Sequence, residues 1–432
     1  MTTFTCHPSS EVYGYIRVPG DKSISHRSIM LSSIADGTSE ITGFLQGEDS
    51  LHTLKAFQAM GVDIQRDADK IVVQGVGLHG LAAPSGDLYM GNSGTAMRLL
   101  TGLLSGQAFN SRLTGDESLS GRPMKRVTEP LAQMGGLIES QSGGTAPLTI
   151  HGGRRLTGIH YALPVASAQI KSCVLLAGLY AEGVTEVIEP APTRDHTERM
   201  LRGFGCEVLS DGGSIRLAGG QRLVASNIEV PADISSAAFF IVAASITANS
   251  EITLTHVGIN PTRTGILDIL ELMGADITLI NERIVGGEPV ADIVVKSAPL
   301  KGIDIPERLV PLAIDEFPVI FVAAACASGR TRLTGAEELR VKESDRIQVM
   351  ADGLVALGID ARPAADGITI EGGVIGGGQV DSHGDHRIAM AFAVASLRAS
   401  GPLRIEDCDN VNTSFPGFAE IANHAGMHIE VS

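Results

Sequence analysis

Apolar residues gather in six runs along the chain, and each run predicts a helix that is buried on all sides. The runs span residues 28–35, 96–104, 170–181, 237–248, 319–327 and 388–397. A helix that is apolar around its whole circumference belongs inside a domain, because none of its faces suits contact with water. Between the runs, segments such as 70–74 and 367–371 alternate apolar and polar residues, which predicts half-buried strands.

A second helical pattern recurs after each buried run, and each copy stops at an apolar residue followed by glycine. The pairs are Met60-Gly61, Met134-Gly135, Phe204-Gly205, Met273-Gly274, Leu357-Gly358 and Ala425-Gly426. They recur at intervals of about 70 residues, which indicates an internal repeat. Each repeat is predicted to be a βαβαββ module with one buried and one outer helix, giving an α/β fold of six repeats.

Three modules packed around their buried helices make one domain, so six modules predict two domains. Two segments of similar sequence, Val18–Ser23 and Val230–Ser235, are expected to be the crossings, at which the chain passes from one domain to the other. We expect a double hinge near 19–22 and 230–234. The N-terminal domain then spans 21–231, and the C-terminal domain combines 1–20 with 232–432, completed by the N-terminal strand.

The starts of the buried helices carry cations, which is an unusual position for them. Five cations share this placement: Lys22, Arg27, Arg98, Lys171 and Arg387. The helix dipole disfavours a cation in the first turn, whereas free N–H groups there favour a bound anion. If the buried helices of each domain point the same way, six N-termini face one cleft that holds anionic ligands. Ordinary capping is the alternative for Asn92, Ser235 and Ser236.

Composition excludes several other classes of protein. The 33 basic against 49 acidic residues give a net charge of −16, which argues against a general nucleic-acid binder. Five scattered cysteines without a CxxC motif argue against disulfides and a zinc ribbon. The longest apolar stretch is too short for a membrane span, and no signal peptide is visible at the N-terminus, so we expect a cytoplasmic protein.

Four further segments contain charged or metal-ligating residues. Residues 116–126 carry three basic residues and form either a solvated loop or an anion site. Residues 340–346 are expected to begin a helix that places Lys342 and Arg346 on one face, with a surface ion-pair face as the alternative. Residues 193–198 start either an exposed helix or a binding segment. Residues 381–386 resemble a metal site, but no clustered ligands support one, so no metal is expected.

These motifs together resemble the 5-enolpyruvylshikimate-3-phosphate synthase (EPSP synthase) family over nearly the whole chain. The carriers are Gly20–Ser23, Gly91–Arg98, Gly121–Met124, Ser167–Gln169, Arg340–Arg346 and Gly384–Arg387. The resemblance implies an inside-out barrel of two domains, each with three βαβαββ units around buried parallel helices. Arg194–Glu198, Ser167–Lys171 and Asn260–Arg263 resemble the class II branch of that family.

The resemblance implies transfer of the enolpyruvyl group of phosphoenolpyruvate to the 5-hydroxyl of shikimate 3-phosphate, through a tetrahedral ketal and with release of phosphate. Its implied catalytic residues are Asp315, Glu343 and Lys22. The implied ligands of shikimate 3-phosphate are Lys22, Ser23, Arg27, Ser167, Ala168, Gln169, Arg194, Asp315 and Lys342. Those of phosphoenolpyruvate are Lys22, Gly94, Arg122, Gln169, Arg346, His386 and Arg387. No cofactor, nucleic-acid partner or membrane is implied, and a monomer is expected.

One departure from the family concerns the C-terminus. Many class I members have a lysine before a C-terminal Phe-Pro, whereas this chain has Asn412-Thr413-Ser414 there. Gly94 leaves room for the inhibitor glyphosate, while the class II markers favour tolerance, so we predict intermediate sensitivity. Anions that bind among like-signed cations of both domains are also expected to favour a closed form.

Two alternatives remain. The sister transferase that acts on UDP-N-acetylglucosamine shares the fold, but typically has a cysteine in its active loop, and Gly115–Met124 has none. A catalytically inert binding protein on the same scaffold, for example one that recognises RNA terminal phosphates, is disfavoured by the net charge and by the Asp315 and Glu343 pair.

Overall fold

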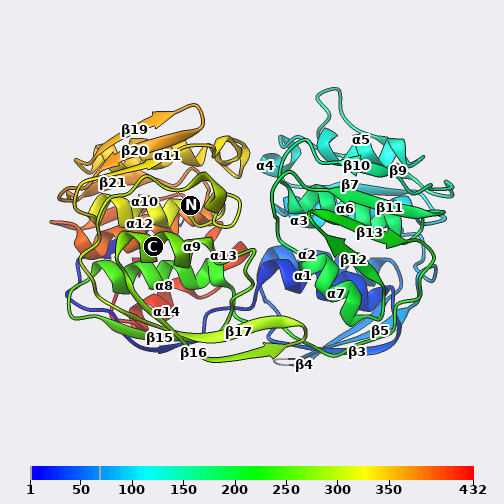
Figure 1. The fold of residues 1–432 in the computed structure, drawn as a ribbon, viewed down its shortest axis with the longest axis horizontal. Coiled ribbons are helices and arrows are strands. Elements are labelled where there is room, and N and C mark those ends of the chain that lie inside the picture. The colour runs from blue at the N-terminus through cyan, green and yellow to red at the C-terminus, as the bar shows by residue number, and fades with distance from the viewer. Residues whose placement is uncertain (1, 68–69) are drawn as a thin grey trace. The chain divides into compact units, whose positions relative to one another are not determined.

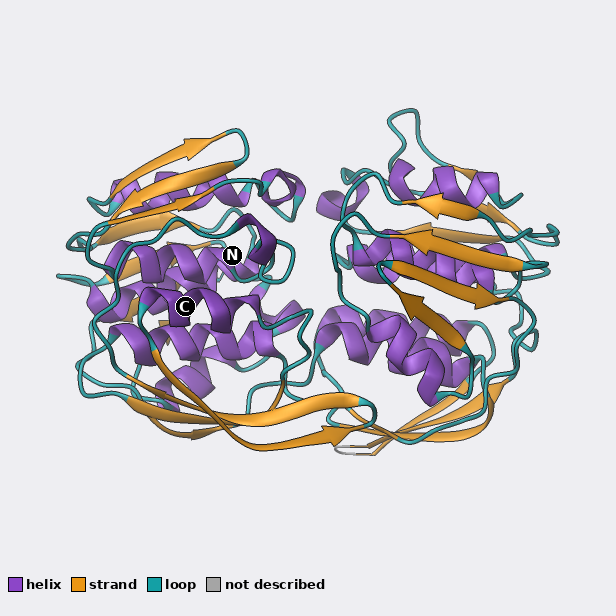
Figure 2. Cartoon of the chain, viewed as in Figure 1, coloured by secondary structure: helices purple, strands orange, loops and turns teal. Residues whose placement is uncertain are grey.

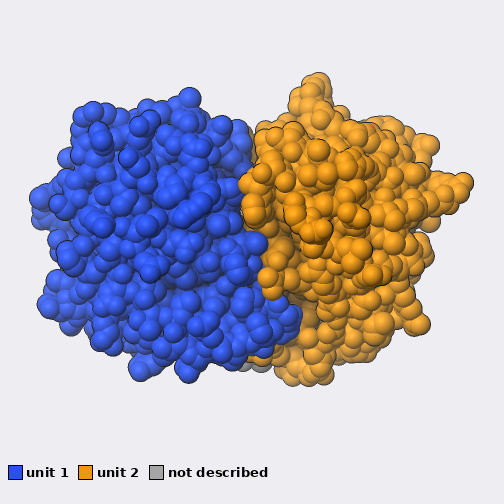
Figure 3. Space-filling model, viewed as in Figure 1, with its two compact units in different colours: residues 1–21, 231–432 blue, residues 22–230 orange. Residues whose placement is uncertain are grey.

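The computed structural model describes residues 2–67 and 70–432, and it divides into two compact units (Figure 3). Unit 2 is the continuous segment Lys22–Val230, whereas unit 1 combines Met1–Asp21 with Pro231–Ser432. Both units consist of small sheets around buried helices (Figure 2). No helix among the described residues is long and apolar enough to cross a membrane.

Unit 2 contains three sheets, with the strand orders β14-β3-β5-β4, β6-β7-β9-β8 and β10-β11-β13-β12. In each sheet the first pair is parallel and the other two pairs are antiparallel, so the three sheets repeat one pattern. The strands are β3 (Asp36–Thr42), β4 (Asp63–Asp67), β5 (Lys70–Val76), β6 (Leu88–Tyr89), β7 (Ser111–Thr114), β8 (Leu137–Glu139), β9 (Leu148–His151), β10 (His160–Ala162), β11 (Val184–Ile188), β12 (Val208–Asp211), β13 (Ser214–Ala218) and β14 (Ile228–Glu229). The helices are α1 (Lys22–Ser33), α2 (Glu48–Ala59), α3 (Gly94–Ser105), α4 (Glu117–Ser120), α5 (Lys125–Gln133), α6 (Ala168–Gly178) and α7 (His196–Gly203).

In unit 1 the sheets β16-β17-β15-β2 and β21-β22-β1-β23 also combine one parallel pair with two antiparallel pairs, whereas the sheet β18-β20-β19 has three strands in antiparallel pairs. The strands are β1 (Phe4–His7), β2 (Tyr13–Ile16), β15 (Glu251–Gly258), β16 (Asp276–Val285), β17 (Glu288–Lys296), β18 (Arg330–Leu333), β19 (Asp360–Ala364), β20 (Gly367–Glu371), β21 (Gly378–Asp381), β22 (Leu403–Glu406) and β23 (His428–Val431). The helices are α8 (Ile234–Ile246), α9 (Gly265–Met273), α10 (Phe317–Cys326), α11 (Arg346–Ala356), α12 (His386–Ala395), α13 (Val411–Ser414) and α14 (Phe418–His424), with short 3-10 helices at Glu307–Leu309, Glu337–Val341 and Ser396–Arg398.

The six apolar runs form the cores of the two units. Each overlaps one of the helices α1, α3, α6, α8, α10 and α12, most of whose residues are buried. Every residue of α8 is buried. In unit 1, α8, α10 and α12 contact one another (Figure 1), and in unit 2, α3 packs on α6. The predicted buried helices are therefore confirmed, and burial of whole helices explains why these runs lack a polar face.

The outer helices end as their glycines predict. Gly61, Gly135, Gly205, Gly274, Gly358 and Gly426 all have φ between +84° and +98°. A residue with a Cβ rarely adopts this conformation, which glycine reaches at little cost. The repeated apolar-Gly pairs therefore mark real helix ends in all six modules, and the predicted repeat is confirmed.

The two crossing segments pair with each other in unit 1. Gly20 and Ala232 form an antiparallel bridge, the Asp21 amide donates to the Pro231 carbonyl at 2.8 Å, and the Asp233 amide donates to the Pro19 carbonyl at 2.9 Å. Further from the crossing, β1 lies between β22 and β23. The N-terminal segment thus contributes both a central strand and one crossing to unit 1.

Candidate active site

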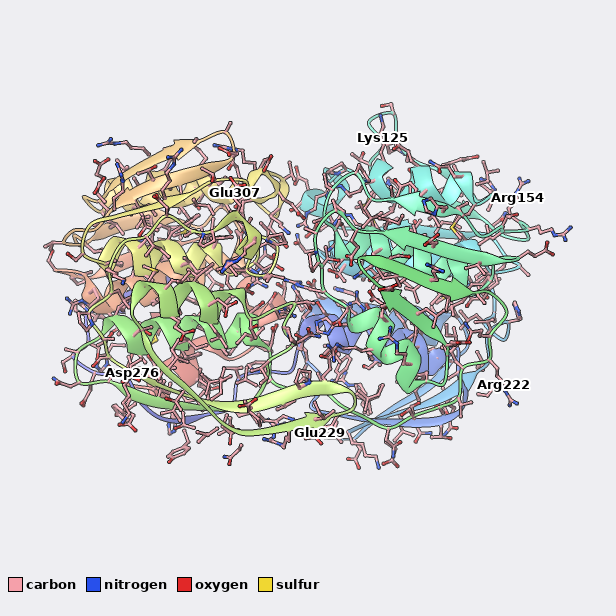
Figure 4. The ribbon with its side chains drawn as sticks, viewed as in Figure 1. Lys125, Arg154, Arg222, Glu229, Asp276 and Glu307 are labelled. Carbon is pink, nitrogen blue, oxygen red and sulfur yellow. The ribbon has the colours of Figure 1, made fainter. Side chains whose placement is uncertain are left out.

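Several charged side chains at the starts of the buried helices are buried or half-buried, whereas Arg154, Arg222 and Asp276, labelled in Figure 4, are exposed. In unit 2, Lys22 is the first residue of α1, and its Nζ lies 3.2 Å from Oδ2 of Asp49 in the first turn of α2. Asp49 is buried, and Lys22 remains partly exposed. The ammonium group is therefore held in place while it stays within reach of a ligand.

Arg27 connects three helices of unit 2. Its Nε donates to Thr197 on α7 at 2.7 Å, its Nη2 to Ser172 on α6 at 2.8 Å, and its Nη1 to the carbonyl of Ser23 at 2.9 Å. The side chain is buried, while Ser23 is half-buried. Arg27 thus fixes α1 against α6 and α7 in addition to any contact it makes with a ligand.

A second group of residues surrounds the start of α3. Arg122 donates to the carbonyl of Asn92 at 3.1 Å and to its Oδ1 at 2.6 Å, and Asn92 in turn donates to Asp116 at 2.7 Å. Arg98 donates to Gln169 of α6 at 2.7 Å. Arg122 is buried although Glu117, Ser118, Gly121 and Pro123 around it are exposed, so this partly solvated segment anchors one cation.

Gly94 lies close to the guanidinium groups of Arg98 and Arg122. A Cβ at this position would lie 2.9 Å from Nη1 of Arg98 and 3.4 Å from Nη1 of Arg122. The absence of a side chain thus leaves room beside two cations at a helix N-terminus, where Ser93 already caps the Ala96 amide. Such a place suits an anionic group.

Lys171 of α6 is only 1% exposed and lies between two buried carboxylates. Its Nζ is 3.0 Å from Glu189 and 2.7 Å from Glu198, and burial raises the pKa of Glu189 while Lys171 opposes the rise. The segment that these contacts fasten to α6 carries the half-buried Arg194. Residues 196–198 are buried, so α7 does not begin as an exposed helix.

The nearby start of α6 carries three of the predicted ligand residues. Ser167 caps the helix and accepts from the amide of Ile170. Ala168 and Gln169 follow it and are partly exposed. Their backbone amides belong to the first turn, where N–H groups lack partners within the helix.

In unit 1, Arg346 gathers three carboxylates around one guanidinium group. Its Nε lies 2.8 Å from Asp385, its Nη2 2.6 Å from Glu343, and its Nη1 3.4 Å from Asp315. Arg346 is 1% exposed, and although burial opposes it, the charges of these acids raise the pKa of Arg346 above its ordinary value. Lys342 also contacts Asp315, at 3.4 Å. Four of the predicted site residues are thereby brought together.

The helix expected across residues 340–346 is wrong. A 3-10 helix ends at Val341, Lys342 leaves the helical conformation with ψ −148°, and α11 begins only at Arg346. The reason is a cap, because the Asp345 side chain accepts from the Gln348 amide and so starts a new helix. Lys342 and Arg346 nevertheless meet, through Asp315 and not through a shared helix face.

The start of α12 holds the last two predicted residues. Asp385 caps the Arg387 amide at 2.9 Å and also binds Arg346. His386 contacts Ser414 at 3.1 Å. Ser414 belongs to the segment in which many class I members have a lysine, so this segment supports the histidine. Arg387 is buried, and within the described residues 2–67 and 70–432 no carboxylate lies at ion-pair distance from it. A buried cation without a paired carboxylate is favourable for an anionic ligand.

Two carboxylates that hold cations in unit 2 could not be predicted from the sequence, because Asp49 and Glu189 belong to none of its motifs. Glu198 lies in the class II-like segment, but nothing in the sequence pairs it with Lys171. In the part of the chain that the structure describes, no group of three His, Cys, Asp or Glu could hold a metal ion.

Comparison with known proteins gives a consistent result. A family model described as EPSP synthase (3-phosphoshikimate 1-carboxyvinyltransferase) matches residues 6–421. A 3-phosphoshikimate 1-carboxyvinyltransferase of Alkalilimnicola ehrlichii is 66% identical over 426 residues, covering 98% of this chain and 96% of that protein. One from Methylococcus capsulatus is 63% identical over 430 residues, covering 99% and 98%.

Solved structures agree with the sequence relatives. The 2.37 Å structure of EPSP synthase from Acinetobacter baumannii aligns over 100% of both chains, with 58% identity and a TM-score of 0.90. The enolpyruvyl transferase NikO from Streptomyces tendae aligns over 100% of this chain and 99% of its own, with a TM-score of 0.80. At 16% identity, that second likeness shows a shared fold.

Proposed function

Because the chain belongs to the EPSP synthase (3-phosphoshikimate 1-carboxyvinyltransferase) family, we propose that the charged clusters of the two units carry its reaction. The enzyme transfers the enolpyruvyl group of phosphoenolpyruvate to shikimate 3-phosphate, a step of aromatic amino-acid biosynthesis. The chemistry requires an acid and base, and cations for the phosphate and carboxylate groups. Unit 1 offers the acid and base, and both units offer cations.

The observation that carries the proposal is the shared guanidinium of Arg346, which contacts both Asp315 and Glu343. Asp315 is the base for the proton of the 5-hydroxyl group, and Glu343 handles the proton at the methylene carbon of phosphoenolpyruvate. The hydroxyl adds to the adjacent carbon, and the resulting ketal expels phosphate. The protons balance if Glu343 starts protonated, gives its proton to the methylene carbon during addition and takes one back from the resulting methyl group as phosphate leaves, while Asp315 holds the hydroxyl proton until it passes to the departing phosphate.

Cations and residues at helix starts bind each of the two substrates. Arg122, Arg346, Arg387 and Lys22 hold the phosphate and carboxylate of phosphoenolpyruvate, beside Gly94, Gln169 and His386. The remaining set, Ser23, Arg27, Ser167, Ala168, Gln169, Arg194 and Lys342, holds shikimate 3-phosphate together with Lys22 and Asp315. Arginine suits this task because its planar fork binds oxyanions through two parallel hydrogen bonds. The protein acts without a cofactor, as a cytoplasmic monomer.

A phosphate-release assay with three arms tests the proposal. Phosphoenolpyruvate is supplied with shikimate 3-phosphate, with UDP-N-acetylglucosamine, or alone, and release is expected only in the first arm. Asp315→Asn and Glu343→Gln are each expected to lower kcat by about 10²- to 10⁴-fold, because each removes one proton-transfer group.

Glu307→Gln is the matched control, since Glu307 is an exposed acid of the same unit (Figure 4). It should leave kcat within about twofold, as most surface substitutions have little effect. Full activity of Asp315→Asn, with circular dichroism showing an intact fold, would remove Asp315 from its role. Release in the UDP-sugar arm alone would identify the sister transferase instead.

A further inference from the structure

Arg263 lies outside the clusters described above, yet it binds both crossing segments. Its Nη1 lies 2.8 Å from Oδ2 of Asp21, which belongs to the first crossing. Its Nη2 lies 3.0 Å from Oδ1 of Asp233, which belongs to the second. The same nitrogen donates to Ser235 at 2.7 Å, and Arg263 is only 3% exposed.

The partners of Arg263 are neighbours of the proposed catalytic residues in the chain. Asp21 is joined through one peptide bond to Lys22. Ser235 donates its hydroxyl to Glu316, which directly follows Asp315. One buried hydrogen-bonded network of unit 1 therefore includes the residue before Lys22 and the residue after Asp315.

Arg263 is the cation that contacts Asp21 and Asp233 directly, and the charge of Arg387 also acts on Asp233. Asp21, Asp233 and Glu316 are all buried, and the charge of Asp315 also acts on Arg263. Burial, followed by the charge of Asp21, raises the pKa of Asp233, as expected where acids outnumber the cation. Without Arg263, the carboxylates would repel one another and move apart.

The need to hold the two crossing segments together does not by itself explain the side-chain contacts of Arg263. The crossing backbones are already paired by the Gly20–Ala232 bridge and by two hydrogen bonds between main-chain atoms. Arg263 adds directed contacts from two nitrogens to three side chains, which fix position as well as proximity. Asn260 and Thr262, which precede Arg263 in the chain, are hydrogen-bonded to each other. The side chain of Arg263 therefore extends from a rigid turn.

We propose that Arg263 is a positioning residue for the transfer reaction, which fixes the backbone beside Lys22 and Asp315. This inference rests on the proposed function, because it takes Lys22 and Asp315 as catalytic residues. Displacement of a reacting group by about 1 Å can cost roughly 10²-fold in rate. Loss of Arg263 should therefore act on kcat more than on binding of shikimate 3-phosphate, most of whose proposed ligands belong to unit 2.

The test compares Arg263→Lys and Arg263→Met with the wild-type enzyme. For each protein, kcat and KM are measured by phosphate release, and the Kd of shikimate 3-phosphate by calorimetry. We expect kcat to fall by about 10²-fold in Arg263→Met and roughly tenfold in Arg263→Lys, which keeps the charge but loses the fork. The Kd should change by less than about threefold, because the ligand contacts are retained.

A matched control distinguishes the loss of positioning by Arg263 from a general loss of protein stability. Val295→Ala makes a cavity in β17, a buried strand of the same unit that is remote in sequence from the network, and it should lower the melting temperature without lowering kcat more than about twofold. If Arg263→Met does not fold, Ser235→Ala, which keeps both ion pairs, is measured in its place and should lower kcat about threefold.

The inference is overturned if a folded Arg263 variant has the kcat of the wild-type enzyme. It is also overturned if Arg263→Met does not fold and Ser235→Ala has the kcat of the wild-type enzyme. An inactive wild-type enzyme would instead overturn the proposed function.

Discussion

Buried guanidinium groups organise both clusters through directed contacts. Arg346 contacts three carboxylates through its three nitrogens, and Arg27 reaches a different hydrogen-bond acceptor with each of its own. The guanidinium group is planar and always charged, so its donors keep fixed directions when it is buried. Lysine offers a point charge without this geometry, and it cannot replace arginine at either position without loss of order.

Gly94→Ala tests how much room these cations need. The new Cβ would lie 2.9 Å from Arg98, which holds Gln169, so the guanidinium must shift and the anion site must shrink. We expect the inhibition constant of glyphosate to rise about tenfold or more and the KM for phosphoenolpyruvate to rise less, measured by steady-state kinetics. Gly86→Ala is the matched control, because a Cβ there meets nothing within 4 Å. Unchanged inhibition in Gly94→Ala would show that Arg98 adapts freely.

The cations could be predicted from the sequence, but their partners could not. Lys22 and Arg387 occupy helix starts where the dipole disfavours them, and this mismatch is visible in one dimension. Asp49 also lies at a helix start, where an acid is ordinary and carries no signal. Its contact with Lys22 depends on the packing of α2 beside α1, which only the folded chain specifies.

Helices were the most predictable elements, since each has a boundary signal in the sequence. The buried runs and the terminal glycines predicted all six modules, and Gly274 even forms the left-handed cap of α9. The failure at residues 340–346 arose where helical spacing continued across Asp345, whose side chain caps a new helix. A period of four residues between Lys342 and Arg346 could not distinguish one helix from two elements that meet at Asp315.

Lys171→Met tests the link between α6 and the segment around Arg194. It leaves Glu189 and Glu198 buried without their cation, which should reduce the free energy of unfolding by about 3–5 kcal/mol at pH 8. Burial already raises the pKa of Glu189 above its ordinary 4.5, so its charged form costs stability as pH rises above that value. The deficit of the variant should therefore be smaller at pH 5 than at pH 8, as measured by urea unfolding.

Lys70→Met is the control for that experiment. Lys70 pairs with Glu40 at 2.6 Å, but both side chains are exposed, so its loss should cost at most about 1 kcal/mol. A deficit in Lys171→Met that is equal at both pH values would show that the two glutamates do not take up protons when the lysine is removed.

The two units are expected to unfold as separate cooperative bodies, and the cysteines can report this. Cys173 and Cys206 lie in unit 2, and Cys6, Cys326 and Cys408 lie in unit 1. Burial raises the pKa of Cys206 to about 11 and those of Cys6, Cys326 and Cys408 to about 12, so few reactive thiolates exist at pH 8. We expect all five to resist iodoacetamide in the native protein and to become reactive in two sets as urea increases, followed by mass spectrometry. Different midpoints for Cys173 and Cys206 would contradict cooperative unfolding of unit 2.

The position of β1 has a consequence for how the protein is made. This strand is synthesised about 400 residues before its partners β22 and β23. At typical translation rates of about 5–20 residues per second, it waits roughly 20–80 seconds for them. Unit 2, whose segment is continuous, can meanwhile condense on the emerging chain, so vectorial synthesis imposes an order of assembly. Phe4 and Cys6 are buried in the folded chain, so until β22 and β23 are made these apolar side chains lack their final partners and the strand lacks its neighbours in the sheet.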